Sequence, residues 1–90
     1  MPISFESIDW DDLRVFLYAA RTGSLSQAAR RLQVDHSTVS RRIAQLEASI
    51  GSALLLRQRS GLKLNDIGEL LLRHAEKMES AVVSFHEEFN

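Results

Sequence analysis

The sequence has no cysteine, a single proline and no apolar run that approaches the roughly 20 residues a helix needs to cross a bilayer. Without cysteine the chain cannot form a disulfide, and the short apolar runs exclude insertion into a membrane. The first ten residues, MPISFESIDW, lack the basic and long apolar regions of a secretory signal. Internal repeats and low-complexity tracts are also missing. We therefore expect a folded protein that stays in the cytoplasm.

What is present is the composition of an ordinary folded domain, with 44% hydrophobic and 26% charged residues in a chain of 90. A chain of this length can build a modest core, but it cannot enclose a deep substrate cleft between two domains. Its function must therefore lie on a surface or at an interface between copies.

The net charge of −1 hides an uneven distribution of charge along the chain. Residues 1–20 carry one arginine against four acids, a net charge of −3, and residues 64–90 carry two basic residues against six acids, a net charge of −4. Residues 21–63 carry eight basic residues against Asp35 and Glu47, a net charge of +6. A basic block of this kind is typical of a surface that binds nucleic acid.

Capping residues predict two helices in the first third of the chain. Asp9 can cap a helix over about 10–21, and Gly23 ends it. Ser24 can then cap a short second helix over about 25–32. Apolar spacing predicts the inward-facing residues of both helices. They are Trp10, Leu13, Phe16, Leu17 and Ala20 in the first helix, and Leu25, Ala28, Ala29 and Leu32 in the second.

A third helix follows after a tight connection at Gln33 and Val34. Asp35 is a good N-cap residue, and the predicted helix covers residues 36–50. Its apolar residues recur at intervals of 4, 3 and 4, which defines one buried stripe. The stripe consists of Val39, Ile43, Leu46 and Ile50.

The segment LLLRQRSGLKLN, residues 54–65, predicts a small β-hairpin around its Ser-Gly turn. Asn65 and Asp66 can start a last helix, in which apolar residues recur at intervals of 4, 3, 4, 3 and 4. A seam this narrow is typical of a helix that pairs with another helix. The seam residues are Leu71, Ala75, Met78, Val82, Phe85 and Phe89.

The order of these elements predicts a mainly α fold, a winged helix-turn-helix made of three helices and a hairpin wing. We expect this domain to cover residues 1–64 and a long helix over 65–90 to form the coiled coil of a homodimer. Small and apolar contacts between the second and third helices are expected from Ala28, Ala29 and Val34.

The third helix of such a fold enters the major groove of DNA, and its polar face carries the reading residues. Short serine side chains allow a close approach to base edges, and arginine can form a bidentate pair with guanine. Arg42 lies one position round the helix and is expected to contact phosphate, together with residues of the second helix. The expected base-reading residues are His36, Ser37, Ser40 and Arg41, and the second helix contributes Ser26, Gln27, Arg30 and Arg31.

The stretch SLSQAARRLQVDHSTVSRRIAQLE, with the later LLLR and glycine, resembles the N-terminal DNA-binding region of LysR-type transcriptional regulators. The resemblance runs from about Asp9 into the last helix. It implies a homodimer whose linker helices pair, so that its two reading helices reach successive major-groove faces of double-stranded DNA, and it implies a transcription regulator rather than an enzyme. It also implies base reading by the four residues above, and contacts to the DNA backbone by Ser24, Ser26, Thr38 and Arg42.

Two positions depart from the family pattern. Ser60 stands where the family has a basic wing residue that reaches the groove, so Arg59 or Lys63 is the expected substitute, and Arg57 is also expected among the DNA-contacting residues of the wing. His36 replaces the usual glutamine. Family members are about three times longer and carry a C-terminal effector-binding domain, so the sequence is interpreted as one part of such a regulator, with a naturally short protein as the alternative.

Several other interpretations stay open or are excluded by geometry. His86, Glu87 and Glu88 form only a weak local cluster, so neither a metal site nor a cofactor is expected. The residue types of a hydrolytic triad occur at Asp35, His36, Ser37 and Ser40, but neighbouring helical positions point apart and cannot form the Ser–His–Asp hydrogen-bond chain. The seam of the last helix could instead pack on its own domain. The basic face could also be incidental to a winged-helix module that binds another protein.

Overall fold

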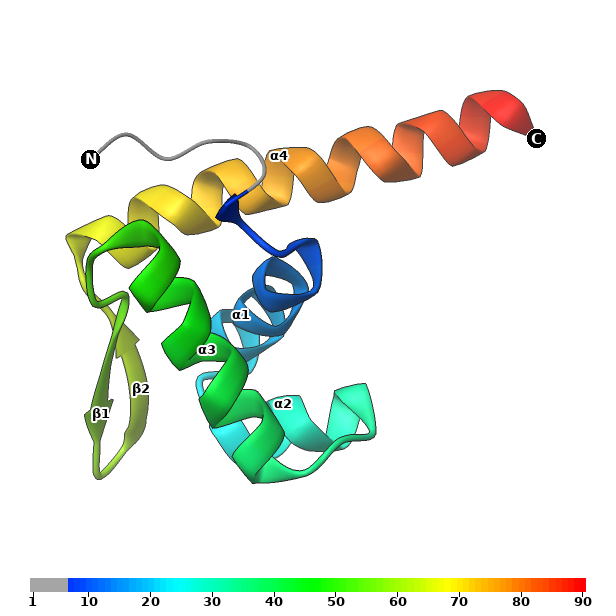
Figure 1. The fold of residues 1–90 in the computed structure, drawn as a ribbon. Coiled ribbons are helices and arrows are strands. Elements are labelled where there is room, and N and C mark those ends of the chain that lie inside the picture. Colours follow the sequence, from blue (N-terminus) through cyan, green and yellow to red (C-terminus); the bar gives the residue numbers. More distant parts are fainter. Residues whose placement is uncertain (1–6) are drawn as a thin grey trace.

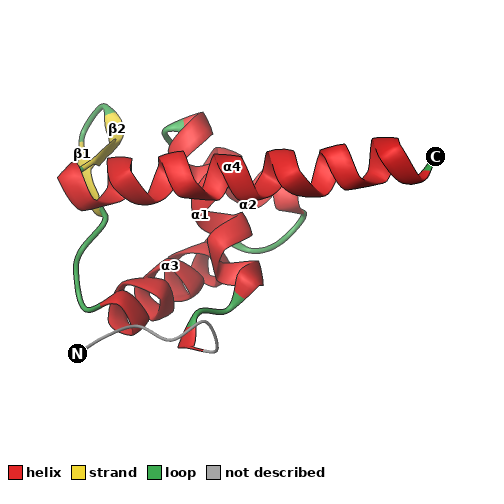
Figure 2. Cartoon of the chain, turned by 90° about the horizontal axis from the view of Figure 1, so that it is seen from above, coloured by secondary structure: helices red, strands yellow, loops and turns green. Residues whose placement is uncertain are grey.

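The computed structural model of the protein describes residues 7–90. Residues 1–6, which belong to the expected domain 1–64, lie outside the described residues. The order of elements along the described chain is the predicted one. The elements are α1 (Trp10–Thr22), α2 (Leu25–Leu32), α3 (His36–Ile50), β1 (Leu55–Gln58), β2 (Gly61–Leu64) and α4 (Asp66–Phe89). Helices α1, α2 and α3 gather into one group, the hairpin stands beside α3, and α4 crosses the group and extends beyond it (Figures 1 and 2).

Local capping explains where the first helices begin and end. The side chain of Asp9 accepts a hydrogen bond from the Asp11 amide at 2.8 Å, and Gly23 ends α1 in the left-handed conformation at φ 68°. Ser24 caps α2 by accepting from the Gln27 amide at 3.2 Å. Gln33 ends α2 at φ 58°, which produces the tight connection to α3. These signals confirm the predicted bounds of α2 and place the end of α1 one residue later than expected.

The core lies where α1 packs against α2, α3 and the hairpin. The predicted stripe of α3 is confirmed: Val39, Ile43 and Leu46 are buried, and Ile50 is partly buried. Helices α1 and α2 contribute further buried side chains to this core. Leu54, which directly precedes β1, is also buried in it. The fully buried large side chains are Phe16, Leu46, Leu54 and Val39.

Two expectations about the core were wrong. Trp10 was expected inside but is 51% exposed, whereas Val15 and Ala19 are buried. The reason is that α1 contacts α2, α3 and α4, so more than one of its faces is covered. Val34 is 41% exposed and does not supply the expected contact between α2 and α3. Asp35 occupies the N-cap position of α3 but makes no capping hydrogen bond with its side chain.

The hairpin wing is confirmed, and contacts at both ends fix its position. Strands β1 and β2 are antiparallel, with Leu55 opposite Leu64 and Gln58 opposite Gly61. The Leu62 amide donates to the Gly23 carbonyl at 3.0 Å, and a side chain at Gly61 would collide with that carbonyl. The wing therefore docks on the turn between α1 and α2. Leucine-rich strands form here because Leu55, Leu62 and Leu64 pack on the core.

Helix α4 is anchored at its start and uncovered at its end. Asn65 caps it by accepting from the Gly68 amide at 2.8 Å and ties it to the wing by donating to the Ala53 carbonyl at 2.7 Å. Gly68 lies against the Leu54 carbonyl, where a Cβ atom would overlap the oxygen. No helix among residues 7–90 is both long and apolar enough to span a bilayer.

The predicted seam of α4 divides into two halves. Leu71 and Met78 are partly buried against the core and Ala75 is buried, so this half packs on its own domain. The second half stays uncovered, and the exposed fractions are 68% for Val82, 67% for Phe85 and 78% for Phe89. The rings of Phe85 and Phe89 stack on each other, with their centroids 6.1 Å apart.

Candidate nucleic-acid interface

Helix α3 turns one face to the core and the opposite face to solvent. His36, Ser37 and Arg41 are exposed and Ser40 is partly exposed, while Val39 and Ile43 on the other side are 0% and 5% exposed. The structure therefore brings the four expected base-reading residues together on one accessible surface. Thr38, on the same first turns, is partly buried.

Basic and polar residues of α2 extend this surface. Ser26, Gln27, Arg30 and Arg31 are all exposed. Ser24 is partly buried because its oxygen caps the helix, which leaves its hydroxyl proton available to a second partner. Helix α2, the first turns of α3 and the tip of the hairpin lie on the side of the molecule away from α4 (Figure 1). Arg30, Arg31 and Arg41 of the basic block thus lie exposed on this side of the fold.

Arg42 does not share this exposure. Its Nη1 atom lies 3.1 Å from a carboxylate oxygen of Asp11 and 3.2 Å from one of Asp12. Asp12 is only 4% exposed, and burial raises the pKa of its carboxyl while the hydrogen bond from Arg42 opposes that rise. Sequence reasoning gave Arg42 to phosphate and missed this partner, because Asp12 lies 30 residues earlier and reads there as an ordinary first-turn acid.

The wing places its basic residues at different points. Arg59 and Lys63 are exposed, and Arg59 lies with Ser60 in the turn between β1 and β2. Arg57 lies farther back on β1, where its Nη2 atom donates to Ser40 Oγ at 3.3 Å. At the base of the wing, Glu47 accepts from the Leu54 amide at 2.7 Å and joins the end of α3 to the hairpin.

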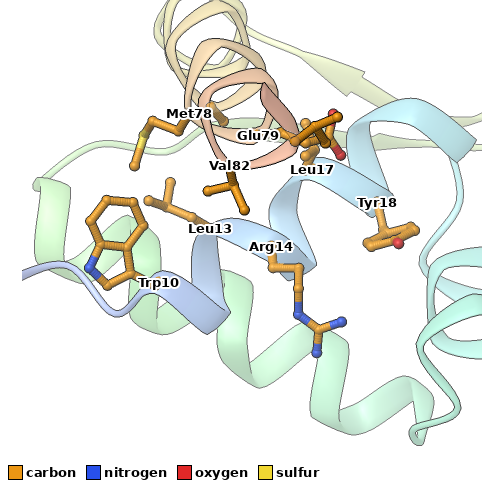
Figure 3. Close-up of a pocket in the computed structure, with 10 residues that line it drawn as sticks. Trp10, Leu13, Arg14, Leu17, Tyr18, Met78, Glu79 and Val82 are labelled. Carbon is orange, nitrogen blue, oxygen red and sulfur yellow. The ribbon is translucent and has the colours of Figure 1, made fainter. Parts of the chain in front are cut away.

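An open apolar groove of about 280 Å³ separates α1 from the middle of α4. In Figure 3 the side chains of Trp10, Leu13 and Val82 converge between the two helices, and the guanidinium of Arg14 points away from α4. Met78 and Val83 complete the α4 wall. This groove runs into the uncovered second half of the seam, on the side of the molecule away from the hairpin tip.

Arg21 connects α1 to α4 beside this groove. Its guanidinium forms two hydrogen bonds with Glu79, at 2.6 and 2.9 Å, and a longer contact with Glu76 at 3.5 Å. The hydrogen bond from Arg21 holds the pKa of Glu79 below its ordinary value of 4.5. Because the folded pKa is lowered, this pair stabilises the fold above pH 4.5, and the contribution is lost as the pH falls through the folded pKa.

We expect Arg21→Met to lower the free energy of unfolding slightly at pH 6, because both side chains are largely exposed and screened. The difference from the unmodified protein should shrink when the pH falls well below 4.5. Denaturant titrations at several pH values measure this, with Arg73→Met on exposed α4 as the charge-matched control. A difference that stays constant down to pH 2 would contradict the ion-pair explanation.

Possible metal ligands do not gather anywhere among the described residues: no group of three His, Cys, Asp or Glu side chains comes together between residues 7 and 90. His86 lies near the end of α4, where its ring contacts the Asn90 amide at 2.7 Å.

Comparisons with known proteins agree on one family. Residues 10–69, two thirds of the chain, match the family described as "Bacterial regulatory helix-turn-helix protein, lysR family". An uncharacterised HTH-type transcriptional regulator, YusT of Bacillus subtilis (strain 168), is 46% identical over 67 residues, 74% of this chain and 23% of its own length. The HTH-type transcriptional regulator HdfR of Yersinia enterocolitica is 40% identical over 73 residues, 81% of this chain and 25% of its own length.

Solved structures give the same result. The DNA-binding domain of BenM in complex with catB site 1 DNA superposes with a TM-score of 0.85 at 27% identity, over 91% of this chain and 92% of that chain. The CbnR DNA-binding domain in complex with DNA has a TM-score of 0.81 at 27% identity, over 90% of this chain and 93% of that chain. The chain spans about a quarter of the length of the curated relatives, and these relatives are regulators, not enzymes. The chain therefore belongs to the LysR family of bacterial helix-turn-helix regulators.

Proposed function

We propose that the chain is the DNA-binding part of a LysR-type transcription regulator and binds double-stranded DNA in a sequence-specific manner. The observation that carries this proposal is the exposed polar face of α3, backed by a fully buried stripe. A helix anchored in this way can enter the major groove without losing its contacts to the core. Two of the structural neighbours are complexes with DNA, which supports the same function.

Base reading and phosphate binding fall to different residues in this proposal. Arg41 is the first choice for a base contact, because an exposed guanidinium can pair with O6 and N7 of guanine. Ser37 and Ser40 permit the close approach, and His36 reads from the first turn. The backbone contacts come from Ser24, Ser26, Gln27, Arg30, Arg31 and Thr38 on α2 and α3, and from Arg59 and Lys63 on the wing.

The homodimer is also part of the proposal, with a second copy of this chain as the occupant of the exposed apolar surface. Val82 and Phe85 are 68% and 67% exposed, the last part of α4 extends beyond the domain (Figure 1), and the groove between α1 and α4 continues that surface. Exposed apolar patches of this kind mark interfaces. Leu71, Ala75 and Met78 already contact their own domain, so we assign the central contacts to the second half of the seam.

The division between base reading and phosphate binding is tested with Arg41→Ala and Arg30→Ala. Arg41→Ala should weaken binding to a selected operator by about 1 to 3 kcal/mol more than binding to random DNA, because one bidentate base contact is lost. Arg30→Ala should weaken binding to both duplexes alike and lower the salt dependence by about one phosphate contact. The operator is obtained by selecting bound sequences from random duplexes with the unmodified chain.

Two results would count against the proposal. Equal losses on operator and random DNA for both variants would refute the division of labour. Salt-insensitive binding, or no binding at about 50 mM salt, would instead favour a winged-helix module that binds another protein through the α1–α4 groove.

A further inference from the structure

Arg57 links the wing to the centre of the reading face. It lies on β1, 17 residues after Ser40, and its Nη2 atom donates to the Ser40 hydroxyl oxygen at 3.3 Å. Both residues border a small cavity of about 70 Å³ between α3 and the hairpin. The apolar part of its lining includes Leu25, Ile43 and Leu62. Arg57 therefore crosses from one element to another above the core.

The hairpin that carries Arg57 is held in place by contacts with the rest of the fold. Its backbone pairs with Leu62 across the hairpin, and the Leu62 amide is in turn bonded to the Gly23 carbonyl. Leu62 and Leu55 pack against the core cluster around Val39 and Ile43. Because the hairpin is fixed, the Arg57 guanidinium can orient the Ser40 hydroxyl with little loss of side-chain entropy when DNA binds.

The hydrogen bond decides which role is left to the Ser40 hydroxyl. A serine hydroxyl has one proton to donate and two lone pairs that can accept. Because Ser40 Oγ accepts from Arg57, its proton remains available for DNA. The major-groove edges that accept are N7 and O6 of guanine, N7 of adenine and O4 of thymine, whereas the amino group of cytosine only donates. The positively charged guanidinium polarises the hydroxyl toward donation and makes its remaining lone pair a poorer acceptor, so Ser40 held in this way favours acceptor edges over donor edges.

We propose that Arg57 is a specificity-determining residue that acts through Ser40, by fixing this hydroxyl as a hydrogen-bond donor toward one base. The inference rests on the proposed function, because it requires α3 to lie in the major groove. It gives Arg57 a role different from that of Arg59, which lies in the turn at the hairpin tip and is suited to phosphate. In this proposal the wing contributes to sequence reading through strand β1 and contacts the DNA backbone through the turn at its tip.

Selection of bound sequences from random duplexes tests the inference, with the chain of residues 1–90 and four variants. These are Ser40→Ala, Arg57→Met, the double variant and Arg59→Met as the matched control. Ser40→Ala and Arg57→Met should relax the preference at the same base pair by about two- to tenfold, the change that one hydrogen bond supports. The double variant should relax it no further. Arg59→Met should weaken binding to all duplexes alike with the preference unchanged.

Three outcomes would overturn the inference. Arg57→Met could weaken operator and random DNA equally and leave the base preference intact, which would make Arg57 a phosphate contact. It could relax a different base pair from the one Ser40→Ala relaxes, or its effect could add to that of Ser40→Ala. Failure of the proposed function looks different, because the unmodified chain would then select no sequence and show no salt-dependent binding. Both side chains lie at the surface, so loss of folding does not confuse these outcomes.

Discussion

Replacing Phe85 with glutamate is expected to convert the proposed homodimer into a monomer. Phe85 is 67% exposed and stacks on Phe89, so the substitution removes little from the core of one copy. In a symmetric interface the variant places two like charges close together and buries each carboxylate without a partner. Sedimentation measures the change in mass, and the midpoint of thermal unfolding extrapolated to low concentration should stay nearly the same.

Loss of the dimer should lower the affinity for operator DNA more than the loss of any single base contact. A dimer engages two half-sites, and its second reading helix binds at a high effective concentration once the first is in place. Loss of the dimer should therefore lower affinity for a two-half-site operator by about 10² to 10⁴, while affinity for one half-site stays unchanged. Titrations against duplexes with one and two half-sites separate these terms.

Ser84→Glu is the control for this experiment. It adds the same charge at the neighbouring exposed position of α4, outside the predicted seam. This variant should remain a dimer and keep its preference for two half-sites. If Phe85→Glu sediments as an unchanged dimer, the second half of α4 is not the interface.

The anchoring of α4 explains why dimerisation would position two reading helices rather than merely tether them. Asn65 and Gly68 seat its first turn on the wing, and Ala75 packs against the domain. The hydrogen bonds from Arg21 on α1 to Glu79 also hold α4 to the domain. Because the helix is fixed to the domain over its first half, pairing of the second halves fixes the separation of the two α3 helices. Half-site spacing then follows from the geometry of the dimer.

Local signals explain which parts of the fold were predictable. Gly23 and Ser24 mark the start of α2 so strongly that its bounds needed no tertiary information, and the stripe on α3 follows from spacing alone. The division of the α4 seam could not be predicted, because apolar residues at heptad spacing have the same pattern whether they face a core or a partner. The exposure of Val34 depends on how closely α2 and α3 approach, which no local pattern reports.

The contacts that shape the site are mostly non-local and were missed for that reason. Arg57 and Ser40 belong to different predicted elements, and nothing in either segment indicates the other. The same holds for Arg42 and Asp12, which are 30 residues apart. Helical periodicity predicts that Arg42 lies near the edge of the reading face. The structure adds that its guanidinium is paired there with the carboxylates of Asp11 and Asp12.

Removal of Arg42 should therefore reduce stability strongly. Arg42→Met leaves the carboxylate of Asp12 buried without its partner, and breaking a buried ion pair in this way costs about 3 to 5 kcal/mol. The Arg42 side chain is 30% exposed, so we expect a smaller loss of about 2 to 4 kcal/mol at pH 7. Denaturant unfolding measures it, and Asp12→Asn in the same chain should restore most of the loss.

The pH dependence of this loss follows from the direction of the Asp12 pKa. Burial already raises that pKa above its ordinary value of 3.8, and without Arg42 it rises further. A raised folded pKa means that the cost of the ionised form appears as the pH rises through the unfolded and then the folded pKa. The deficit of Arg42→Met should thus be largest at neutral pH and small below pH 3.8. A deficit independent of pH would show that packing of the arginine stem, not its charge, is what matters.

DNA binding by the double variant Asp12→Asn/Arg42→Met decides between the two roles of Arg42. If its function is to hold α3 against α1, the double variant folds and binds operator and random DNA with the affinity and salt dependence of the unmodified chain. A phosphate contact would instead leave the double variant weaker on every duplex, with a salt slope lower by about one. We expect the first result, because the Nη1 atom of Arg42 is already shared between the carboxylates of Asp11 and Asp12, and a phosphate would have to compete with both.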